Sequence, residues 1–353
     1  MKYVVGVLGG TGIVGQRMIS ILARHPWFDL AFITASEKSS GKKYKEAVDW
    51  VLETPLPPNI ADLEIIDTNI KEIIEYKPDI VFSALPSRIA RNIEVLLAKE
   101  GINIVSNASP MRMDSDVPLI NPEVNANHLE LIEQQRENRG WNGFIVKVPN
   151  CSTAILTLAL KPLHDEFGLK RVIVSTMQSL SGAGLRGVPS ILILDNIIPY
   201  IENEEWKIEN ETRKILGTLE NKKVSEPSIG ITASCHRVMV LEGHLEAVFT
   251  ETREKASTEQ AITVLKEFAN NKIKDLNLPT APKHPIIVRE EPDRPQPRLD
   301  RFAGNGMSIT VGRVREDKVL NGLKFLVLGH NTIRGAAGTA VLIAELIVKK
   351  KII

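Results

Sequence analysis

The chain has 353 residues, its formal net charge at pH 7 is +1, and apolar and charged residues make up 43% and 25% of it. These values are typical of a globular protein, and without a long run of like charge they give no reason to expect a nucleic acid or a membrane as a partner. One hydrophobic core rarely serves so long a chain, so we expect two domains. The two cysteines, Cys151 and Cys235, are far apart, and the apolar first residues suggest a strand rather than a secretory signal. We therefore expect a cytoplasmic protein with neither a disulfide framework nor a metal site.

The first residues predict a nucleotide-binding unit. Tyr3–Leu8 is a run of β-branched and apolar residues, a glycine-rich turn follows at residues 9–15, and Gln16–Arg24 has helical spacing. A G-x-G-x-x-G pattern between a strand and a helix is typical of dinucleotide binding, because glycine lets the backbone approach a pyrophosphate and the helix N-terminus favours its charge. A turn without a ligand is the alternative. The residues expected to contact the cofactor are Gly10, Thr11, Gly12, Ile13, Val14 and Gly15.

The loop after the next strand favours NADP over NAD. The strand is expected at Leu30–Thr34, and small hydroxyl residues and lysines follow it in place of the acid that usually holds the ribose 2′-hydroxyl of NAD. Ser36 and Ser39 are the candidates for binding the 2′-phosphate, with Lys38 or Lys42 nearby. The alternative is a solvated basic loop.

Two further strands are expected to end at the same edge of the sheet. Asp79–Ala84 is a buried strand whose Ser83 lies at the end that faces the cofactor cleft in such sheets. Asn103–Ser106 is the next strand, and Arg112 lies in the loop that follows it. An arginine there can bind a phosphate or a carboxylate through two hydrogen bonds, and a surface arginine is an equal alternative.

Cys151 lies where a buried strand at residues 144–148 leads into an apolar helix. Asn150 is a turn residue, and Ser152 or Thr153 can hydrogen-bond the free amides of a helix start. The positive end of the helix dipole would favour the thiolate, which is the reactive form of cysteine. The alternative is a buried cysteine that packs as a small hydrophobic residue.

The second half of the chain mixes strand and helix patterns. The expected strands are Arg171–Gln178, Ile229–Ala233, Cys235–His244, Leu245–Thr250, Met307–Val314 and Leu323–Leu328, of which the last two are antiparallel. The expected helices are Pro189–Ile198, Thr258–Asn271 and Gly335–Val348. Ser181 and Gly182 lie in a glycine loop that can bring a flat ring or a carbonyl group close to backbone amides. Glu204 and Lys207 share a helix face, where a surface ion pair is the plainer alternative to substrate binding.

His244 is the natural acid–base partner for Cys151, because the unperturbed pKa of histidine lies near neutrality. A single strand would place Arg237 and His244 on opposite faces, unless a break at Gly243 redirects the histidine. The other histidines remain competitors on sequence alone; they are His25, His128, His164, His236, His284 and His330.

Taken in order, seven stretches resemble the aspartate-β-semialdehyde dehydrogenase family, in its archaeal and fungal branch. They are GGTGIVG, SNASPMRM, PNCSTA, QSLSGAG, EEWK with ETRKILG, HRVMVLEGH and HNTIRGAAG, and they span the whole chain. The resemblance implies an α/β fold with a Rossmann-type NADP-binding domain (residues 1–148 and 332–353) and an α+β catalytic and dimerisation domain with a mixed sheet (residues 149–331). It also implies a small-molecule substrate and assembly as a homodimer or homotetramer.

The resemblance further implies a reaction. Cys151 would attack the acyl carbonyl of β-aspartyl phosphate, and Gln178 would orient the resulting thioester. His244 would move the proton as NADPH reduces the thioester to aspartate 4-semialdehyde, a step of lysine, threonine and methionine biosynthesis.

Other residues are implied to hold the substrate and the cofactor. Those for the substrate are Arg237 for its α-carboxylate, Glu204 for its amino group, and Arg112, Asn150 and Lys207 for its phosphate. Those for the nicotinamide are Asn331 and the loop of Ser181 and Gly182.

Three rival functions fit the sequence less well. Malonyl-CoA reductase resembles this family, but its substrate has no amino group, so Glu204 and Lys207 favour an amino-acid phosphate. N-acetyl-glutamyl-phosphate reductase usually has its cysteine in a Gly-Cys-Tyr setting, which this chain lacks. A non-enzymatic NADP sensor would make Cys151 or His244 dispensable.

Overall fold

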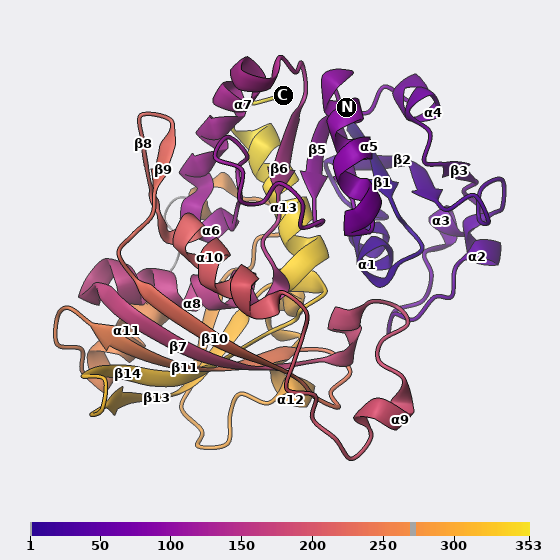
Figure 1. The fold of residues 1–353 in the computed structure, drawn as a ribbon. Coiled ribbons are helices and arrows are strands. Elements are labelled where there is room, and N and C mark those ends of the chain that lie inside the picture. The colour runs from indigo at the N-terminus through magenta and orange to yellow at the C-terminus, as the bar shows by residue number, and fades with distance from the viewer. Residues whose placement is uncertain (1, 269–272) are drawn as a thin grey trace.

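A computed structural model of the chain describes residues 2–268 and 273–353. It contains two six-stranded sheets and a small two-stranded sheet (Figure 1). Within these described residues, no helix is both long enough and apolar enough to cross a bilayer.

The first sheet is parallel, with the strand order β3-β2-β1-β4-β5-β6 of a doubly wound nucleotide-binding fold. Its strands are β1 (Tyr3–Leu8), β2 (Phe28–Ala35), β3 (Ile65–Asp67), β4 (Ile80–Ser83), β5 (Asn103–Ser106) and β6 (Phe144–Lys147). The connecting helices are α1 (Ile13–Leu22), α2 (Tyr44–Ala47), α3 (Pro58–Ala61), α4 (Ile70–Glu75), α5 (Ser87–Lys99), α6 (Pro122–Asn125), η1 (Ala126–Glu130) and α7 (Leu131–Arg139). Strands β4 and β6 are buried along their whole length, because helices cover both faces of a parallel sheet.

The C-terminal helix packs with the first sheet. A single π-helical turn, η5 (Ile333–Ala337), leads into α13 (Gly338–Lys349), whose Val341 and Ile343 lie in the same core cluster as Val5 and Ile19. Helix α13 contacts both α1 and β5. The last residues therefore complete the domain that the first residues begin.

The second sheet is mixed, with the order β10-β7-β11-β14-β13-β12. Its strands are β7 (Leu169–Gln178), β10 (Gly230–Arg237), β11 (His244–Thr252), β12 (Ile286–Arg289), β13 (Ile309–Asp317) and β14 (Gly322–Gly329), and β8 (Thr218–Glu220) pairs separately with β9 (Lys223–Ser225). The helices of this half are α8 (Cys151–Phe167), η2 (Leu180–Ala183), α9 (Ser190–Ile193), α10 (Glu204–Leu216), α11 (Thr258–Glu267), η3 (Lys274–Leu276), α12 (Pro297–Asp300) and η4 (Ala303–Gly306). Helices α8 and α10 lie on one face of the sheet (Figure 1), where they bury apolar side chains with it.

This architecture confirms the predicted fold class, a Rossmann-type parallel sheet combined with a mixed-sheet domain. Strands β1 and β5 begin and end where the sequence predicted them. Met307–Val314 and Leu323–Leu328 were also correctly expected to pair antiparallel, as β13 and β14 do.

Three predicted elements need correction. The helix expected at Pro189–Ile198 shrinks to α9, because most of its apolar side chains are exposed and only Ile193 is buried within α9. The strand expected within Cys235–His244 ends at Arg237 as part of β10, and the break considered at Gly243 is present, since Gly243 has φ +98° and β11 starts at His244. Helix α11 ends at Glu267, short of the expected end, and Asn271 lies outside the described residues.

Candidate active site

The two domains enclose a cavity of about 560 Å³ at their junction. Cys151, which follows the loop after β6, lines the cavity, together with α1 and the Arg112 loop on one side and with Gln178 of β7 and Arg237 of β10 on the other. Of the residues singled out in the sequence, those lining it are Ile13, Val14, Arg112, Asn150, Cys151, Gln178, Ser181, Gly182, Glu204, Lys207, Arg237 and Asn331. Residues up to 318 positions apart in the sequence thus meet in one site.

Cys151 is the first residue of α8, as the sequence predicted. The cap is Asn150, whose Oδ1 accepts hydrogen bonds from the backbone amides of Ser152 at 3.0 Å and Thr153 at 3.3 Å. The expectation that Ser152 or Thr153 caps the helix is therefore wrong, because the amide side chain one position earlier reaches these amides first. The backbone of Gly335 approaches so closely that a Cβ there would lie 2.7 Å from the Cβ of Cys151.

The Sγ of Cys151 lies 3.3 Å from Nε2 of His244, the first residue of β11. Burial raises the pKa of the Cys151 thiol to about 12, and the nearby Glu204 carboxylate adds to this, although Arg237 and the Ser152 amide act in the opposite direction. Burial also lowers the pKa of His244 well below its ordinary value, with the charge of Arg237 contributing. Both shifts favour the uncharged thiol and imidazole, so burial acts against the thiolate that the helix start was expected to favour.

Glu204 is the centre of a polar cluster at the N-terminus of α8. Its carboxylate accepts hydrogen bonds from Nδ2 of Asn150 at 2.8 Å and Nζ of Lys207 at 2.8 Å, and one from Nε2 of Gln178 at 3.3 Å. Arg237, the last residue of β10, donates to the carbonyl oxygen of Ser179 at 2.7 Å. The site therefore offers a carboxylate, an ammonium and a guanidinium within one cavity.

Arg112 is buried beside this cluster, where Glu211 holds it. Glu211 accepts from Nη1 of Arg112 at 2.9 Å and from the backbone amide of Asn150 at 2.6 Å. The second guanidinium nitrogen of Arg112 donates to the carbonyl of Asn107, and its buried Nε has no partner among the described residues. An unpaired buried donor on the wall of a cavity is suited to an anionic ligand.

Lys214, one turn beyond Glu211 on α10, supports the loop that carries Arg112. Its Nζ donates to the carbonyl oxygens of Arg112 and Asp114 at 2.7 Å and of Val117 at 2.9 Å. Burial lowers the pKa of Lys214 to about 8. The sequence analysis missed Glu211 and Lys214, although their spacing of seven residues from Glu204 and Lys207 places all four on one helix face.

The glycine turn at the start of α1 provides the cofactor end of the site. No side chain caps α1, so its first amides stay free, and a Cβ at Gly15 would lie 2.4 Å from the carbonyl of Gly9. The Tyr44 hydroxyl donates to the carbonyl of Gly10 at 2.8 Å and fixes the turn. This open, side-chain-free helix N-terminus fits a pyrophosphate.

The remaining cofactor candidates differ in their surroundings. Ser36 is exposed and Ser39 half-buried in the loop after β2, with Lys38 and Lys42 exposed beside them. Ser83 is different, because its hydroxyl is fully buried and donates to Glu94 at 2.7 Å. The structure therefore corrects the expectation that this side chain faces the cofactor cleft.

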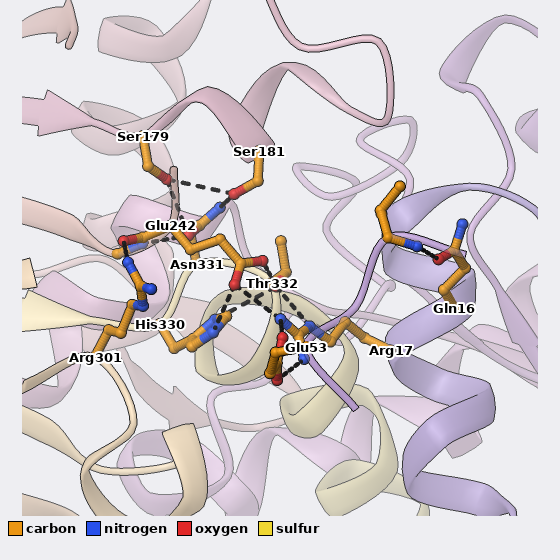
Figure 2. Close-up of polar contacts among 12 residues, drawn as sticks. Gln16, Arg17, Glu53, Ser179, Ser181, Glu242, Arg301, His330, Asn331 and Thr332 are labelled. Atoms are coloured by element: carbon orange, nitrogen blue, oxygen red, sulfur yellow. Dashed lines mark hydrogen bonds and ion pairs between the residues drawn. The ribbon is translucent and has the colours of Figure 1, made fainter. Parts of the chain in front are cut away.

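A polar network joins helix α1 to Glu242 and to residues 330–332 (Figure 2). Arg17 of α1 binds Glu53 at 2.7 Å, Glu242 at 2.8 Å and Thr332 at 3.2 Å. Burial would raise the pKa of Glu242, but the contacts with His330 and Arg17 lower it to about 2. Nothing in the sequence marked Arg17 or Glu242, because they lie 225 residues apart and meet only in the folded chain.

Figure 2 also shows a second set of contacts, which centre on Asn331. Oδ1 of Asn331 accepts from Ser179 Oγ at 3.0 Å and from the amide of Gly243 at 2.8 Å, and its Nδ2 donates to Ser181 Oγ at 2.8 Å (Figure 2). The amide of Ser179 donates to Nδ1 of His244 at 3.1 Å. In the described part of the chain, no group of three or more His, Cys, Asp or Glu residues is arranged to hold a metal ion.

A nucleotide-binding sheet joined to a mixed sheet, with a cysteine and a histidine in contact at the junction, defines a two-domain dinucleotide-binding protein with a nucleophile site. The family model described as "Semialdehyde dehydrogenase, NAD binding domain" matches residues 4–132, and "Semialdehyde dehydrogenase, dimerisation domain" matches residues 160–334. The chain belongs to the aspartate-semialdehyde dehydrogenase family.

Individual relatives are similar over the whole chain. The aspartate-semialdehyde dehydrogenase of Archaeoglobus fulgidus is 55% identical over 353 residues, which is 100% of both chains. The Saccharomyces cerevisiae enzyme of the same name is 46% identical over 100% of this chain and 99% of its own. A malonyl CoA reductase (NADP) of Metallosphaera sedula is 39% identical over 98% of this chain and 96% of its own. The crystal structure of the Candida albicans aspartate semialdehyde dehydrogenase with NADP is 40% identical, covers 99% of this chain and 100% of its own, and has a TM-score of 0.91.

Proposed function

We propose that this protein is an NADP-dependent aspartate-semialdehyde dehydrogenase of lysine, threonine and methionine biosynthesis. It converts L-aspartyl-4-phosphate to L-aspartate 4-semialdehyde and phosphate through a thioester on Cys151. The observation that carries this proposal is the 3.3 Å contact between Cys151 and His244 in a cavity that also holds a carboxylate, an ammonium and two guanidinium groups.

The charges around Cys151 match an amino-acid phosphate. Arg237 binds the α-carboxylate of the substrate, and Glu204 binds its amino group. Arg112, Asn150 and Lys207 bind the phosphate, and the free Nε of Arg112 is the donor best suited to it. Malonyl-CoA carries no amino group, so it would not supply the cation that Glu204 binds in an amino-acid substrate. Malonyl-CoA reduction is therefore the weaker candidate function.

The residues of the cofactor end fit NADP. The glycine turn, with Gly10, Gly12 and Gly15 and the free amides of α1, holds the pyrophosphate, and Ser36 and Ser39 hold the 2′-phosphate. The Ser181–Gly182 loop and Asn331 line the nicotinamide. When bound, NADPH supplies the hydride that reduces the thioester carbonyl.

The chain itself supplies a nucleophile, charge stabilisation and protection from water. Cys151 attacks the acyl carbonyl, and Arg112 with Lys207 stabilises the leaving phosphate. Gln178 orients the thioester, and Nε2 of His244 lies within reach of the sulfur throughout. Arg112, Gln178 and His244 are buried and Cys151 is half-buried, which limits the access of water that would otherwise hydrolyse the thioester.

The assembly and its location are part of the proposal. The matching dimerisation model and the exposed apolar side chains around α9 support a homodimer, and a homotetramer is the larger form to test. The exposed side chains are Ile191, Leu192, Leu194, Ile197 and Tyr200. We assign residues 1–148 and 332–353 to the cofactor domain and 149–331 to the catalytic domain, and we expect the enzyme in the cytoplasm.

The proposal is tested by running the reaction backwards with two pairs of substrates. Aspartate semialdehyde with phosphate and NADP should reduce NADP, whereas malonate semialdehyde with coenzyme A should not. Cys151→Ala should abolish turnover while NADP still binds. Reduction of NADP only with the second pair would instead assign the malonyl-CoA reductase function.

A further inference from the structure

We infer that Tyr44 is a positioning residue for the cofactor: by holding the carbonyl oxygen of Gly10, its hydroxyl aims the backbone N–H of Thr11 at the pyrophosphate of the dinucleotide. Gln16 supports this arrangement by holding the next carbonyl group of the same turn. This role rests on the proposed function for the identity of the cofactor, but it is measured by binding alone and needs no turnover.

Tyr44 reaches the glycine turn from inside the cofactor domain. It is the first residue of α2, its side chain is completely buried, and its ring lies edge-on to that of Trp50, with 6.4 Å between the ring centroids. The hydroxyl oxygen lies 2.8 Å from the carbonyl oxygen of Gly10. Burial raises the pKa of Tyr44 above its ordinary value, so the hydroxyl keeps its proton and acts as the donor.

The planar peptide group passes this orientation on to Thr11. The carbonyl of Gly10 and the N–H of Thr11 belong to one trans peptide group, in which they point in opposite directions. Because Tyr44 draws the carbonyl towards the core, the N–H of Thr11 points away from the core. The amides of Thr11, Ile13 and Val14 make no hydrogen bond within the described part of the chain, and Ile13 and Val14 line the cavity. These free donors at the start of α1 suit a pyrophosphate.

Gln16 holds the following carbonyl. It is fully buried on α1 (Figure 2), and its Nε2 donates to the carbonyl oxygen of Thr11 at 3.1 Å. The same nitrogen donates to the carbonyl of Asp49 at 3.0 Å, while Oε1 accepts from the amide of Val51 at 3.1 Å. Both side-chain N–H groups are therefore used inside the domain, so Gln16 holds the turn rather than binding a ligand.

Packing of a buried aromatic ring is the competing explanation for Tyr44. The backbone contacts of the turn favour positioning instead, because no backbone amide among the described residues donates to the carbonyl of Gly10 or of Thr11. In a regular helix start, amides one turn later would hold these oxygens. The two side chains take the place of those amides. Without the Tyr44 hydroxyl, the peptide group between Gly10 and Thr11 loses the contact that fixes its orientation.

The hydroxyl and the backbone of Tyr44 have separate roles. Tyr44 follows the loop that carries Ser36 and Ser39, and its backbone amide donates to the carbonyl of Leu63 at 2.8 Å, which anchors the end of that loop. Tyr44→Phe removes the hydroxyl and keeps both the ring and the backbone contact. The substitution should therefore affect the pyrophosphate site and spare the 2′-phosphate site.

Titration calorimetry of the whole protein tests this separation. NADP and NAD contain a pyrophosphate and adenosine 2′-monophosphate does not. In Tyr44→Phe the Kd of NADP and of NAD should rise about tenfold, which corresponds to about one hydrogen bond, and that of adenosine 2′-monophosphate should change less than about twofold. Tyr76→Phe is the control, because it removes the hydroxyl of a tyrosine of the same domain that is 41% exposed, and it should leave all three constants unchanged.

The outcomes separate this role from the function proposed above. An unchanged Kd for NADP in Tyr44→Phe would overturn the positioning role. An equal loss of affinity for adenosine 2′-monophosphate would also overturn it, because that result indicates general damage to the domain. A wild-type protein that binds neither dinucleotide would overturn the proposed function together with this role.

A measurement on the wild-type protein does not depend on the folding of a variant. In protein labelled with nitrogen-15 threonine, the amide signal of Thr11 is assigned by its absence in Thr11→Ser. Its proton resonance should move downfield when NADP is added, because a phosphate oxygen accepts a charge-assisted hydrogen bond from this N–H. Adenosine 2′-monophosphate should leave the resonance in place. A Thr11 amide that does not respond to NADP would overturn the role even if Tyr44→Phe fails to fold.

Discussion

Glu211 offers the sharpest test of how the site is held together. It is about 1% exposed and its two carboxylate oxygens serve two donors, Nη1 of Arg112 and the backbone amide of Asn150. Glutamine has the same shape but one oxygen and one NH₂ group. In either orientation of the glutamine side chain in Glu211→Gln, its NH₂ group faces one of the two donors. Arg112 also loses its counter-charge.

The expected loss of stability follows from these contacts. Breaking a buried ion pair by changing one partner costs about 3–5 kcal/mol, and the retained oxygen places Glu211→Gln near the lower end, at about 3 kcal/mol. Because Asn150 caps the cysteine helix and Arg112 lies on the phosphate side of the cavity, kcat/KM should fall about 100-fold as well.

A neighbouring glutamate is the matched control. Glu209 lies on the same helix and accepts from one backbone amide, that of Ala233 at 3.0 Å, so glutamine can still satisfy its partner. Glu209→Gln should lower the free energy of unfolding by about 0.5 kcal/mol or less. Urea unfolding and the KM for phosphate in the reverse reaction measure both effects. Equal stability and equal phosphate KM in the two variants would refute the role assigned to Glu211.

Three other substitutions probe the rest of the site. The pKa of Glu242 is lowered to about 2, so its contribution of about 3 kcal/mol to the free energy of unfolding is present above about pH 4.5 and is lost as the pH falls towards 2. Glu242→Gln should flatten that part of a plot of stability against pH. An unchanged slope would contradict the buried pairing with Arg17. Gly335→Ala places a Cβ 2.7 Å from that of Cys151, so it should lower the free energy of unfolding by about 1–3 kcal/mol and displace the sulfur. Gly230→Ala is the control and should be tolerated, because the nearest atom is 3.8 Å from its Cβ. Equal melting temperatures and equal rates in the two variants would contradict this reasoning. Ser39→Glu should raise the KM for NADP about tenfold and leave that for NAD nearly unchanged, and an unaltered NADP KM would remove Ser39 from the 2′-phosphate site.

The sequence was most informative where local pattern and function coincide. A glycine turn between a strand and a helix has one common structural solution, so β1, the turn and α1 could be predicted from a few residues. The helix start at Cys151 was equally visible, because turn residues precede a long apolar run. The partner histidine came from the resemblance, since seven histidines satisfy the chemistry equally well.

What the sequence did not reveal depends on contacts between distant segments. The helical spacing of Glu211 and Lys214 places them on the face of Glu204 and Lys207, but their contacts with the Arg112 loop arise only in the folded chain, as does the contact of Ser179 with His244. The helix expected at Pro189–Ile198 failed for a related reason, since all but one of the apolar side chains at residues 191–194 and 197 are exposed. Burial, which local sequence does not report, raises the pKa of the Cys151 thiol and so opposes the thiolate that the helix start was expected to favour.

The central claim is that Cys151 carries the acyl group as a thioester. Incubation with aspartate semialdehyde and NADP in the absence of phosphate should halt the reverse reaction at that stage, and mass spectrometry of the digested protein would locate the adduct. We expect an aspartyl group on the peptide that contains Cys151, formed only when NADP is present and released when phosphate is added. An unmodified Cys151 peptide under these conditions, or an adduct on Cys235 instead, would contradict the account.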